Sequence, residues 1–143
     1  VEKIHAGAVG LSGILVPVGV GILDEEGLFP NLKEKKETIE VNGVKCFIEP
    51  AINSEITIIR ATRGDAMGNL EFSGTTQNNN LDMAMAGKYT IAEVGEIVEV
   101  GEIEPSKVGC PGVFVDAVVK GYSKEEHDDL YRNIWTEHNK LFK

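Results

Sequence analysis

The sequence has 143 residues, of which 42% are hydrophobic and 26% are charged, and its formal net charge is -9. This length and composition fit one globular domain with a substantial core. The negative charge argues against sequence-independent DNA or RNA binding, which requires cationic side chains to neutralise phosphates. No apolar run reaches the roughly 18 residues that cross a bilayer. The two cysteines are far apart, so we expect reduced thiols and a cytoplasmic location.

The first third of the chain predicts short elements separated by glycines. Residues 2–8 predict the end of a short helix, and residues 14–16 a short buried strand. The Gly-Val-Gly stretch at residues 19–21 predicts a tight loop, where the backbone can approach a partner closely. Residues 24–37 are polar and rich in turn formers, so we expect an exposed loop.

A hairpin is the clearest local prediction. Residues 38–41 and 44–48 read as strands, and Asn42-Gly43 between them suits a type I′ turn, which needs positive φ at both positions. Pro50 is expected to end the second strand.

The middle of the chain predicts the core. Residues 55–62 form a continuous β-branched run, which is typical of a central strand buried on both faces. A turn and a short strand follow. Residues 81–87 predict a helix that stops at Gly87. Residues 89–100 predict a second core strand with a bend or bulge near Gly95, because glutamates three residues apart cannot share one strand face.

A third buried strand is expected at residues 112–121, followed by a C-terminal helix over residues 123–143. Ser123 and Glu126 are spaced as a capping box, and Asp128 and Arg132 as an i,i+4 ion pair. An apolar stripe is expected at Leu130, Ile134, Trp135 and Leu141.

These elements predict an α/β fold, with an open, mostly parallel sheet and an added antiparallel hairpin. We expect an α/β domain over residues 1–122 and a separate amphipathic helix over residues 123–143.

Local patterns reveal no self-contained catalytic set. His127 and His138 are about three helical turns apart and His5 is remote, so we expect no metal site. Serine-hydrolase elbows, Walker loops and dinucleotide fingerprints are absent from the sequence. The Gly-Val-Gly loop is a weak phosphate-loop signal and is more typical of a tight turn. The Asn78–Asn80 run fits either a structural turn or a ligand contact.

The order of several motifs carries more information. They are DAMGNL (residues 65–70), TTQNNNLDMAMA (75–86), TIAEVGEIVEVGEIEP (90–105) and PGVFVD (111–116). From about Ile4 to Gly121 the chain resembles the C-terminal two-thirds of the A-type subunit of the family I CoA-transferases of the 3-oxoacid, or acetate/acetoacetate, type. The resemblance implies a NagB/RpiA/CoA-transferase-like fold without its N-terminal, glycine-rich part. Where the family usually has Arg-Asn-Phe-Asn, residues 77–80 lack the aromatic side chain.

The resemblance implies transfer of CoA between carboxylic acids, with coenzyme A as substrate carrier and no permanently bound cofactor. In this family the nucleophile is a glutamate in a Ser-Glu-Asn-Gly motif of the B-type subunit. That motif is absent from this sequence, so we assign no catalytic residue and expect activity only in a hetero-oligomer of the two subunit types. The chain is expected to supply walls of the substrate cleft, with candidates Val18, Gly19, Val20, Gly21, Asn78 and Asn80.

Three alternatives remain open on the sequence. An acyl-CoA thioester hydrolase would share the fold but need no acceptor acid. A sugar-phosphate isomerase would need a basic phosphate pocket and its own acid-base pair. A non-catalytic assembly module would dock through its sheet or its terminal helix.

Overall fold

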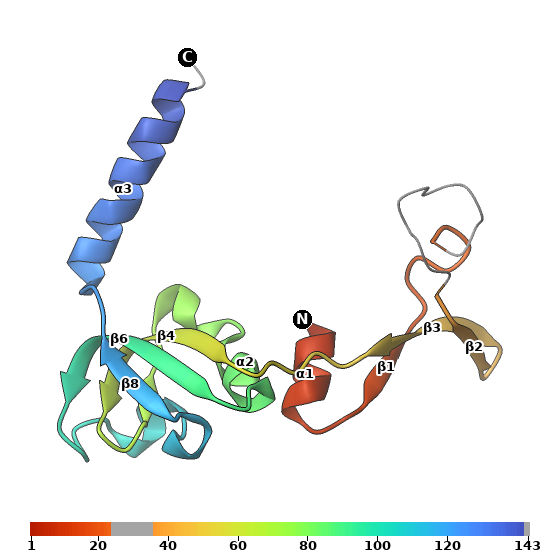
Figure 1. Ribbon diagram of the computed structural model, residues 1–143, viewed down its shortest axis with the longest axis horizontal. Helices are drawn as coiled ribbons and strands as arrows, with labels where there is room; N and C mark the ends of the chain where they lie inside the picture. The colour runs from red at the N-terminus through yellow and green to blue at the C-terminus, as the bar shows by residue number, and fades with distance from the viewer. Residues whose placement is uncertain (24–35, 142–143) are drawn as a thin grey trace.

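The structure, a computed structural model, describes residues 1–23 and 36–141, with side chains through residue 137. Two lobes and a projecting helix make up the molecule (Figure 1). The smaller lobe contains α1 (Glu2–Ala8), β1 (Gly13–Val16), β2 (Thr38–Val41) and β3 (Val44–Pro50). The larger lobe contains β4 (Thr57–Asp65), β5 (Leu70–Glu71), α2 (Asn80–Ala86), β6 (Thr90–Val98), β7 (Val108–Cys110) and β8 (Ala117–Lys120). The C-terminal helix α3 spans Lys124–Leu141.

The smaller lobe confirms the predicted hairpin. Its antiparallel sheet has the order β1-β3-β2, and Asn42 and Gly43 have φ values of 53° and 77°, as a type I′ turn requires. The prediction that the first strand is buried was wrong, because Leu15 is 47% exposed. Strand β1 lies at the edge of a three-stranded sheet, where Leu15 remains exposed.

The larger lobe confirms the α/β fold. Its sheet has the order β7-β5-β4-β6-β8, and the two long pairings, β4 with β6 and β6 with β8, are parallel. The short strands β5 and β7 add antiparallel pairings at one side. Short 3₁₀ turns at Gly74–Gln77 (η1), Pro105–Lys107 (η2) and Gly112–Phe114 (η3) connect the elements.

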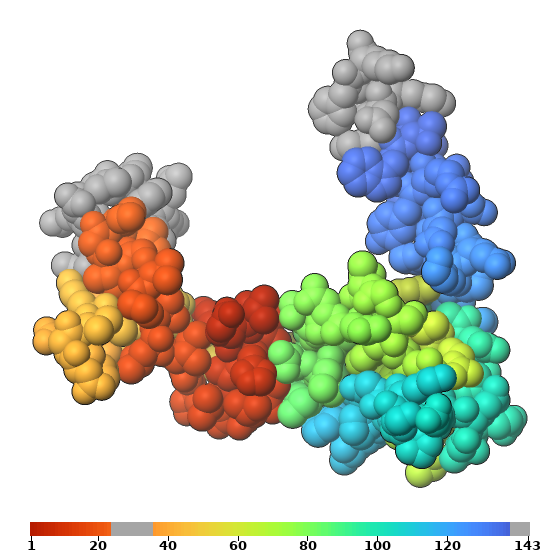
Figure 2. All heavy atoms as spheres, turned by 180° about the vertical axis from the view of Figure 1, so that it is seen from behind, coloured from red at the N-terminus to blue at the C-terminus, as the bar shows by residue number. Residues whose placement is uncertain are grey.

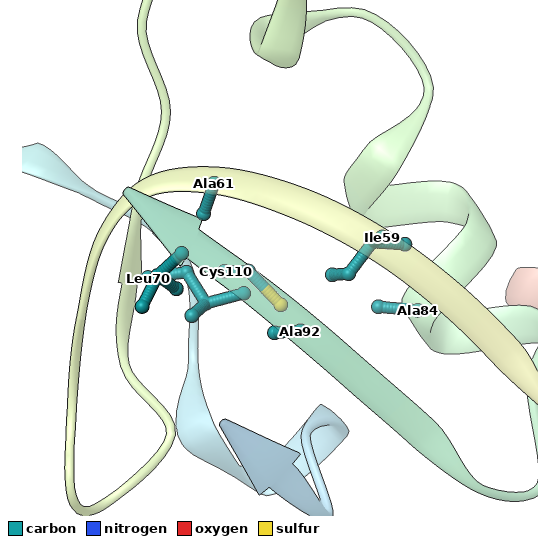
Figure 3. Close-up of a cluster of buried hydrophobic side chains, with 7 residues drawn as sticks. Ile59, Ala61, Leu70, Ala84, Ala92 and Cys110 are labelled. Carbon is teal, nitrogen blue, oxygen red and sulfur yellow. The ribbon is translucent and has the colours of Figure 1, made fainter. Parts of the chain in front are cut away.

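One face of this sheet, here named the packed face, carries the core. Its buried cluster joins strand residues to one alanine of α2 and one cysteine of β7 (Figure 3). The members are Ile59, Ala61, Leu70, Ala84, Ala92, Val94 and Cys110.

The opposite face, here named the open face, is exposed at Ile58. Parallel register places Ile58 beside Ile91 and then Ala117, and the next row contains Arg60, Glu93 and Val119. Ile58 is 66% exposed, so the expectation that the central strand is buried on both faces was wrong.

Two further predictions about the sheet need correction. The register of β4 with β6 keeps a constant offset from Thr57 opposite Thr90 to Asp65 opposite Val98, so of the predicted bend or bulge near Gly95 the pairing excludes the bulge. The third strand, expected over residues 112–121, is limited to β8 at the sheet edge, because η3 takes up the first part of that segment.

Helix α3 confirms the predicted capping box. The Ser123 N–H donates to Glu126 Oε2 at 2.8 Å, and the Glu126 N–H donates to Ser123 Oγ at 3.2 Å. The predicted ion pair was wrong in its partners: Arg132 pairs with Asp129 at 2.9 Å, and Asp128 pairs with Lys124 at 2.6 Å. Figure 2 shows α3 standing clear of the body beyond its base.

Part of two predictions lies outside the described residues, namely residues 24–35 of the polar loop and the Leu141 side chain of the apolar stripe. Across residues 1–23 and 36–141, no helix combines the length and apolar character that a membrane crossing needs.

Candidate functional site

The Asp65 turn fixes the carboxyl end of the central strand. Asp65 is 2% exposed, and its carboxylate accepts hydrogen bonds at 2.9 Å from the Met67 N–H, the Asn69 N–H and Asn69 Nδ2. Gly68 has a φ of 83°, which explains the glycine in DAMGNL. Asn69 Oδ1 then accepts the Gly112 N–H at 3.1 Å, so the turn ties β4 to the segment before β8.

The η1 turn is attached to the same strand by polar side chains. Thr62 and Ser73 share a hydrogen bond between their hydroxyls at 2.7 Å, and Thr76 Oγ1 accepts the Ser73 N–H at 2.9 Å. Asn80 Nδ2 donates to the carbonyls of Arg60 and Thr76, each at 2.9 Å. The amide of Asn80 therefore clamps the turn against β4.

A polar cleft of about 700 Å³ opens between η1 and the base of α3. It lies over the carboxyl-terminal halves of the parallel strands, which is where open α/β sheets bind ligands. Its hydroxyl groups come from Thr62, Ser73, Thr75, Thr76 and Ser123, its cations from Arg60, Lys120 and Lys124, and its carboxylates from Glu96, Glu125 and Asp128.

The cations of this cleft are held by neighbours within the chain. Arg60 pairs with Glu93 and also donates to the Tyr122 carbonyl at 2.7 Å, and Lys120 donates to the Gly95 carbonyl. The hydrogen bond to Asp128 raises the pKa of Lys124. The cleft therefore presents hydroxyl groups beside charged side chains that are largely held by contacts within the chain.

The described residues of the cleft present no nucleophile with a base to activate it. His127 stands at the rim, where its ring meets the Tyr131 ring edge-on at 4.6 Å between centroids. Cys110 is fully buried in the packed face, and burial raises the pKa of its thiol to about 11. Within residues 1–23 and 36–141, no three histidine, cysteine or acidic side chains gather as a metal site.

The structure separates the two predicted wall segments. Asn78 lines a second pocket of about 440 Å³, together with Gln77, Leu81 and Lys107, and this pocket shares no lining residue with the cleft. Residues 18–21 form a turn in the smaller lobe, distant from α2 (Figure 1). Within that turn Gly19 and Gly21 have φ values of 88° and 84°, and Val18 is 78% exposed. This chain alone does not bring the two segments together.

Sequence reasoning missed the hydroxyl groups of the cleft. The available signal was Ser73-Gly-Thr-Thr, which lies between a short strand and a helix and places several hydroxyls on one turn. Thr62 gave no signal, because only the folded register of β4 brings it to the cleft.

The fold and the cleft together define an open α/β protein with a polar cleft over the carboxyl-terminal halves of its parallel strands. A sequence model of the family described as Coenzyme A transferase matches residues 1–121. The chain belongs to this coenzyme A transferase family. The match confirms the family resemblance and leaves helix α3 outside it.

Named relatives agree with this assignment. The chain is 41% identical over 125 residues to the A-type subunit of a probable succinyl-CoA:3-ketoacid coenzyme A transferase from Bacillus subtilis, covering 87% of this chain and 49% of the relative. It is 34% identical over 119 residues to the alpha subunit of acetate CoA-transferase from Escherichia coli K12, covering 83% and 50%. The chain thus spans about half the length of these relatives.

A solved structure shares the fold. The acyl-CoA transferase YdiF of Escherichia coli O157:H7, described as a thioester complex with CoA, superposes with a TM-score of 0.70 and 27% identity. The superposition covers 84% of this chain and 26% of that one.

Proposed function

We propose that this chain forms part of the A-type subunit of a CoA-transferase that acts on short-chain acyl-CoA and carboxylic or 3-oxo acids. The match to relatives named as the A-type or alpha subunits of such transferases carries the proposal. The names of these relatives differ in acyl group, so the proposal extends to the substrate class and not to one acid.

In the proposed reaction, a glutamate of the B-type subunit attacks the acyl-CoA thioester carbonyl and expels the CoA thiolate, which forms an acyl anhydride. The thiolate then attacks the glutamyl carbonyl, giving a glutamyl-CoA thioester and releasing the first carboxylate. An acceptor carboxylate reverses these steps and leaves with CoA. The nucleophile is assigned to a Ser-Glu-Asn-Gly motif of the B-type subunit, and coenzyme A is carried as substrate without a resident cofactor.

The contribution of this chain is shape and polar contacts. An activated glutamyl thioester has to be kept from water between the two half-reactions. The η1 turn is suited to a wall because Asn80 and Thr62 fix it to the central strand. We propose Asn78 as a second position in the wall of the substrate cleft. We also propose that Val18, Gly19, Val20 and Gly21 form part of this wall, but only once the rest of the assembly is in place.

We also propose that the assembly works in the cytoplasm. Both cysteines, Cys46 and Cys110, are free thiols and buried, which suits a reducing compartment. We treat residues 1–122 as the transferase domain and the helix from residue 123 as an appended element.

Reconstitution tests this function. The full chain, co-purified with a B-type CoA-transferase subunit, should transfer CoA from an acyl-CoA to an acceptor carboxylate, and the chain alone should be inactive. CoA release that needs no acceptor would indicate a hydrolase and contradict the proposal. Robust transfer by the isolated chain would also contradict it.

Thr62→Val provides a sharper version of the same test. It removes a hydroxyl that binds Ser73 but keeps the β-branched shape, so we expect lower activity of the reconstituted enzyme with a retained fold. Thr136→Val is the matched control, because Thr136 lies on exposed α3 and its hydroxyl donates to the Arg132 carbonyl at 2.8 Å within the same helix. Equal activity of the two variants would contradict the role given to the η1 turn.

A further inference from the structure

Helix α3 begins beside the polar cleft, although it lies outside the part of the chain that matches the coenzyme A transferase family. The family match ends at residue 121, whereas residues 123–125, His127 and Asp128 all line the cleft. The η1 turn, which lies within the match, lines it through residues 73–76. Figure 1 shows α3 leaving the sheet at the end of β8. The appended helix therefore contributes to this cleft a surface that the family segment alone does not contain.

Arg60 holds the base of α3 to the central strand. Its Nη2 donates to the Tyr122 carbonyl at 2.7 Å, and its Nη1 pairs with Glu93, its neighbour in the parallel register. The Arg60 side chain is 23% exposed, so these contacts are partly shielded from water. A planar guanidinium binds two acceptors in fixed directions, which a compact ammonium group does not reproduce. Arg60 thus ties the segment that leads into α3 to both β4 and β6.

The η1 turn is attached to the same residue through the backbone. Asn80 Nδ2 donates to the Arg60 carbonyl and to the Thr76 carbonyl, each at 2.9 Å. The side chain of Arg60 therefore fixes the base of α3, and its carbonyl fixes η1. Because both attachments start from one residue of β4, the separation between η1 and the base of α3 is set at Arg60.

Two glycines allow the base of α3 to approach the sheet this closely. Gly121 packs against the Glu93 side chain, where an added Cβ would lie 2.0 Å from Oε1. Gly95 lines the cleft, and an added Cβ there would lie 3.1 Å from the Thr62 carbonyl oxygen and 3.5 Å from the Tyr122 carbonyl oxygen. Larger residues at these two positions would push the base of α3 away from the strands.

We propose that the base of α3 is a second wall of the substrate cleft, facing η1, and that Arg60 is the positioning residue that holds this wall in place. The proposal rests on the proposed function, which makes η1 a wall of that cleft. Arg60 acts through the base of α3 and not by contact with substrate. A displaced wall weakens binding of the substrate and of the transition state alike, so KM should change more than kcat.

Distances between spin labels test the position of α3 without an assay of activity. The full-length chain carries one label at Thr136→Cys on α3 and one at Val113→Cys on the larger lobe, where Val113 is 83% exposed. The wild-type chain controls for the two native cysteines, which are buried. We expect one narrow distance distribution, which Arg60→Met broadens or shifts and Arg60→Lys changes less. Arg63→Met is the matched control, because Arg63 lies on the same strand and has a glutamate partner but does not line the cleft.

The distances decide the positioning role by themselves. An unchanged distribution in Arg60→Met would overturn that role, and so would an equal change in Arg63→Met. A broad distribution in the chain with Arg60 intact would also overturn it.

Kinetics of the enzyme reconstituted with a B-type subunit test the wall. Loss of the hydrogen bond from Arg60 should raise KM for at least one of the two substrates by roughly 2–10-fold, with a smaller change in kcat. Arg60→Lys should recover part of this loss, and Arg63→Met should leave KM unchanged. An altered distance distribution with unchanged KM would overturn the role of α3 as a wall. Absence of CoA transfer by the wild-type assembly would contradict the proposed function and the wall with it, while the distances still decide whether Arg60 positions α3.

Discussion

The two faces of the five-stranded sheet differ although the sequence that forms them is continuous. Ile58 and Ile59 are neighbours on β4, yet Ile59 is 3% exposed and Ile58 is 66% exposed. On the packed face, α2 and the strands β5 and β7 contribute Ala84, Leu70 and Cys110 to the core (Figure 3). On the open face, η1 and the base of α3 approach Arg60 and Thr62, and Ile58 remains exposed. A β-branched run therefore specifies a strand, and the location of the covering elements decides which side becomes core.

The largest expected effect comes from substituting Ile59 and its neighbour Ile58, which lie on opposite faces of the sheet. Ile59→Ala should lower the free energy of unfolding by about 2–5 kcal/mol, because it removes buried methyl groups from the packed face. Ile58→Ala should change it by no more than about 0.5 kcal/mol in the monomer. Urea denaturation at low protein concentration measures both. Equal losses at the two positions would show that the faces do not differ in packing.

Substitutions of Asp65 test how much the turn at the end of β4 contributes to the free energy of unfolding. Asp65→Ala leaves the N–H groups of Met67 and Asn69 without their acceptor, so we expect a loss of about 3 kcal/mol in unfolding free energy. Asp65→Asn retains one acceptor oxygen and should lose less. Urea denaturation of both variants gives the comparison, and a tolerated Asp65→Ala would contradict the role given to Asp65 in DAMGNL.

The reactivity of the Cys110 thiol measures burial on the packed face, and no residue of the core has to be substituted. Burial raises the pKa of its thiol from the ordinary 9.0 to about 11. Near pH 8 its thiolate fraction should be about 100-fold lower than that of an unshifted thiol, with a matching fall in reactivity. Disulfide-exchange kinetics with an aromatic disulfide, on a Cys46→Ser variant with and without urea, measure this. Similar rates in both states would contradict it.

The smallest expected effect concerns the smaller lobe. Hydrogen bonds from Lys36 and Lys3 hold the pKa of Glu49 below its ordinary value of 4.5. Their stabilisation is present above that value and is lost as pH falls through the lower pKa of the folded state. Amide exchange in β1 and β3, corrected for intrinsic rates, should therefore accelerate at acidic pH relative to β4. Glu49→Gln should abolish this extra acceleration, and an unchanged profile would contradict the assignment.

Elements set by local chemistry were predicted well. Asn42-Gly43 identified the hairpin, Ser123 and Glu126 the start of α3, and the β-branched run the central strand. Each of these signals acts within a few residues of the element that it predicts. Burial of Leu15 and Ile58 was mispredicted because it depends on covering elements, which lie elsewhere in the sequence and do not reach these two positions among the described residues.

The candidate site was predicted in outline only. The motif order led to the family, and DAMGNL and the asparagine run marked the two turns beside the strand ends. The sequence could not distinguish Asn80, whose amide binds two backbone carbonyls, from Asn78, which lines a pocket. It also could not bring Thr62 to Ser73, because their hydrogen bond depends on how η1 folds over β4.

Trapping the covalent intermediate tests most directly whether the reactive carboxylate lies outside this chain. The reconstituted enzyme is incubated with an acyl-CoA and then with borohydride, which reduces a glutamyl thioester to an alcohol, and the modified peptide is identified by mass spectrometry. We predict a modified glutamate in the Ser-Glu-Asn-Gly motif of the B-type subunit. A modified glutamate within residues 1–143 would contradict this prediction.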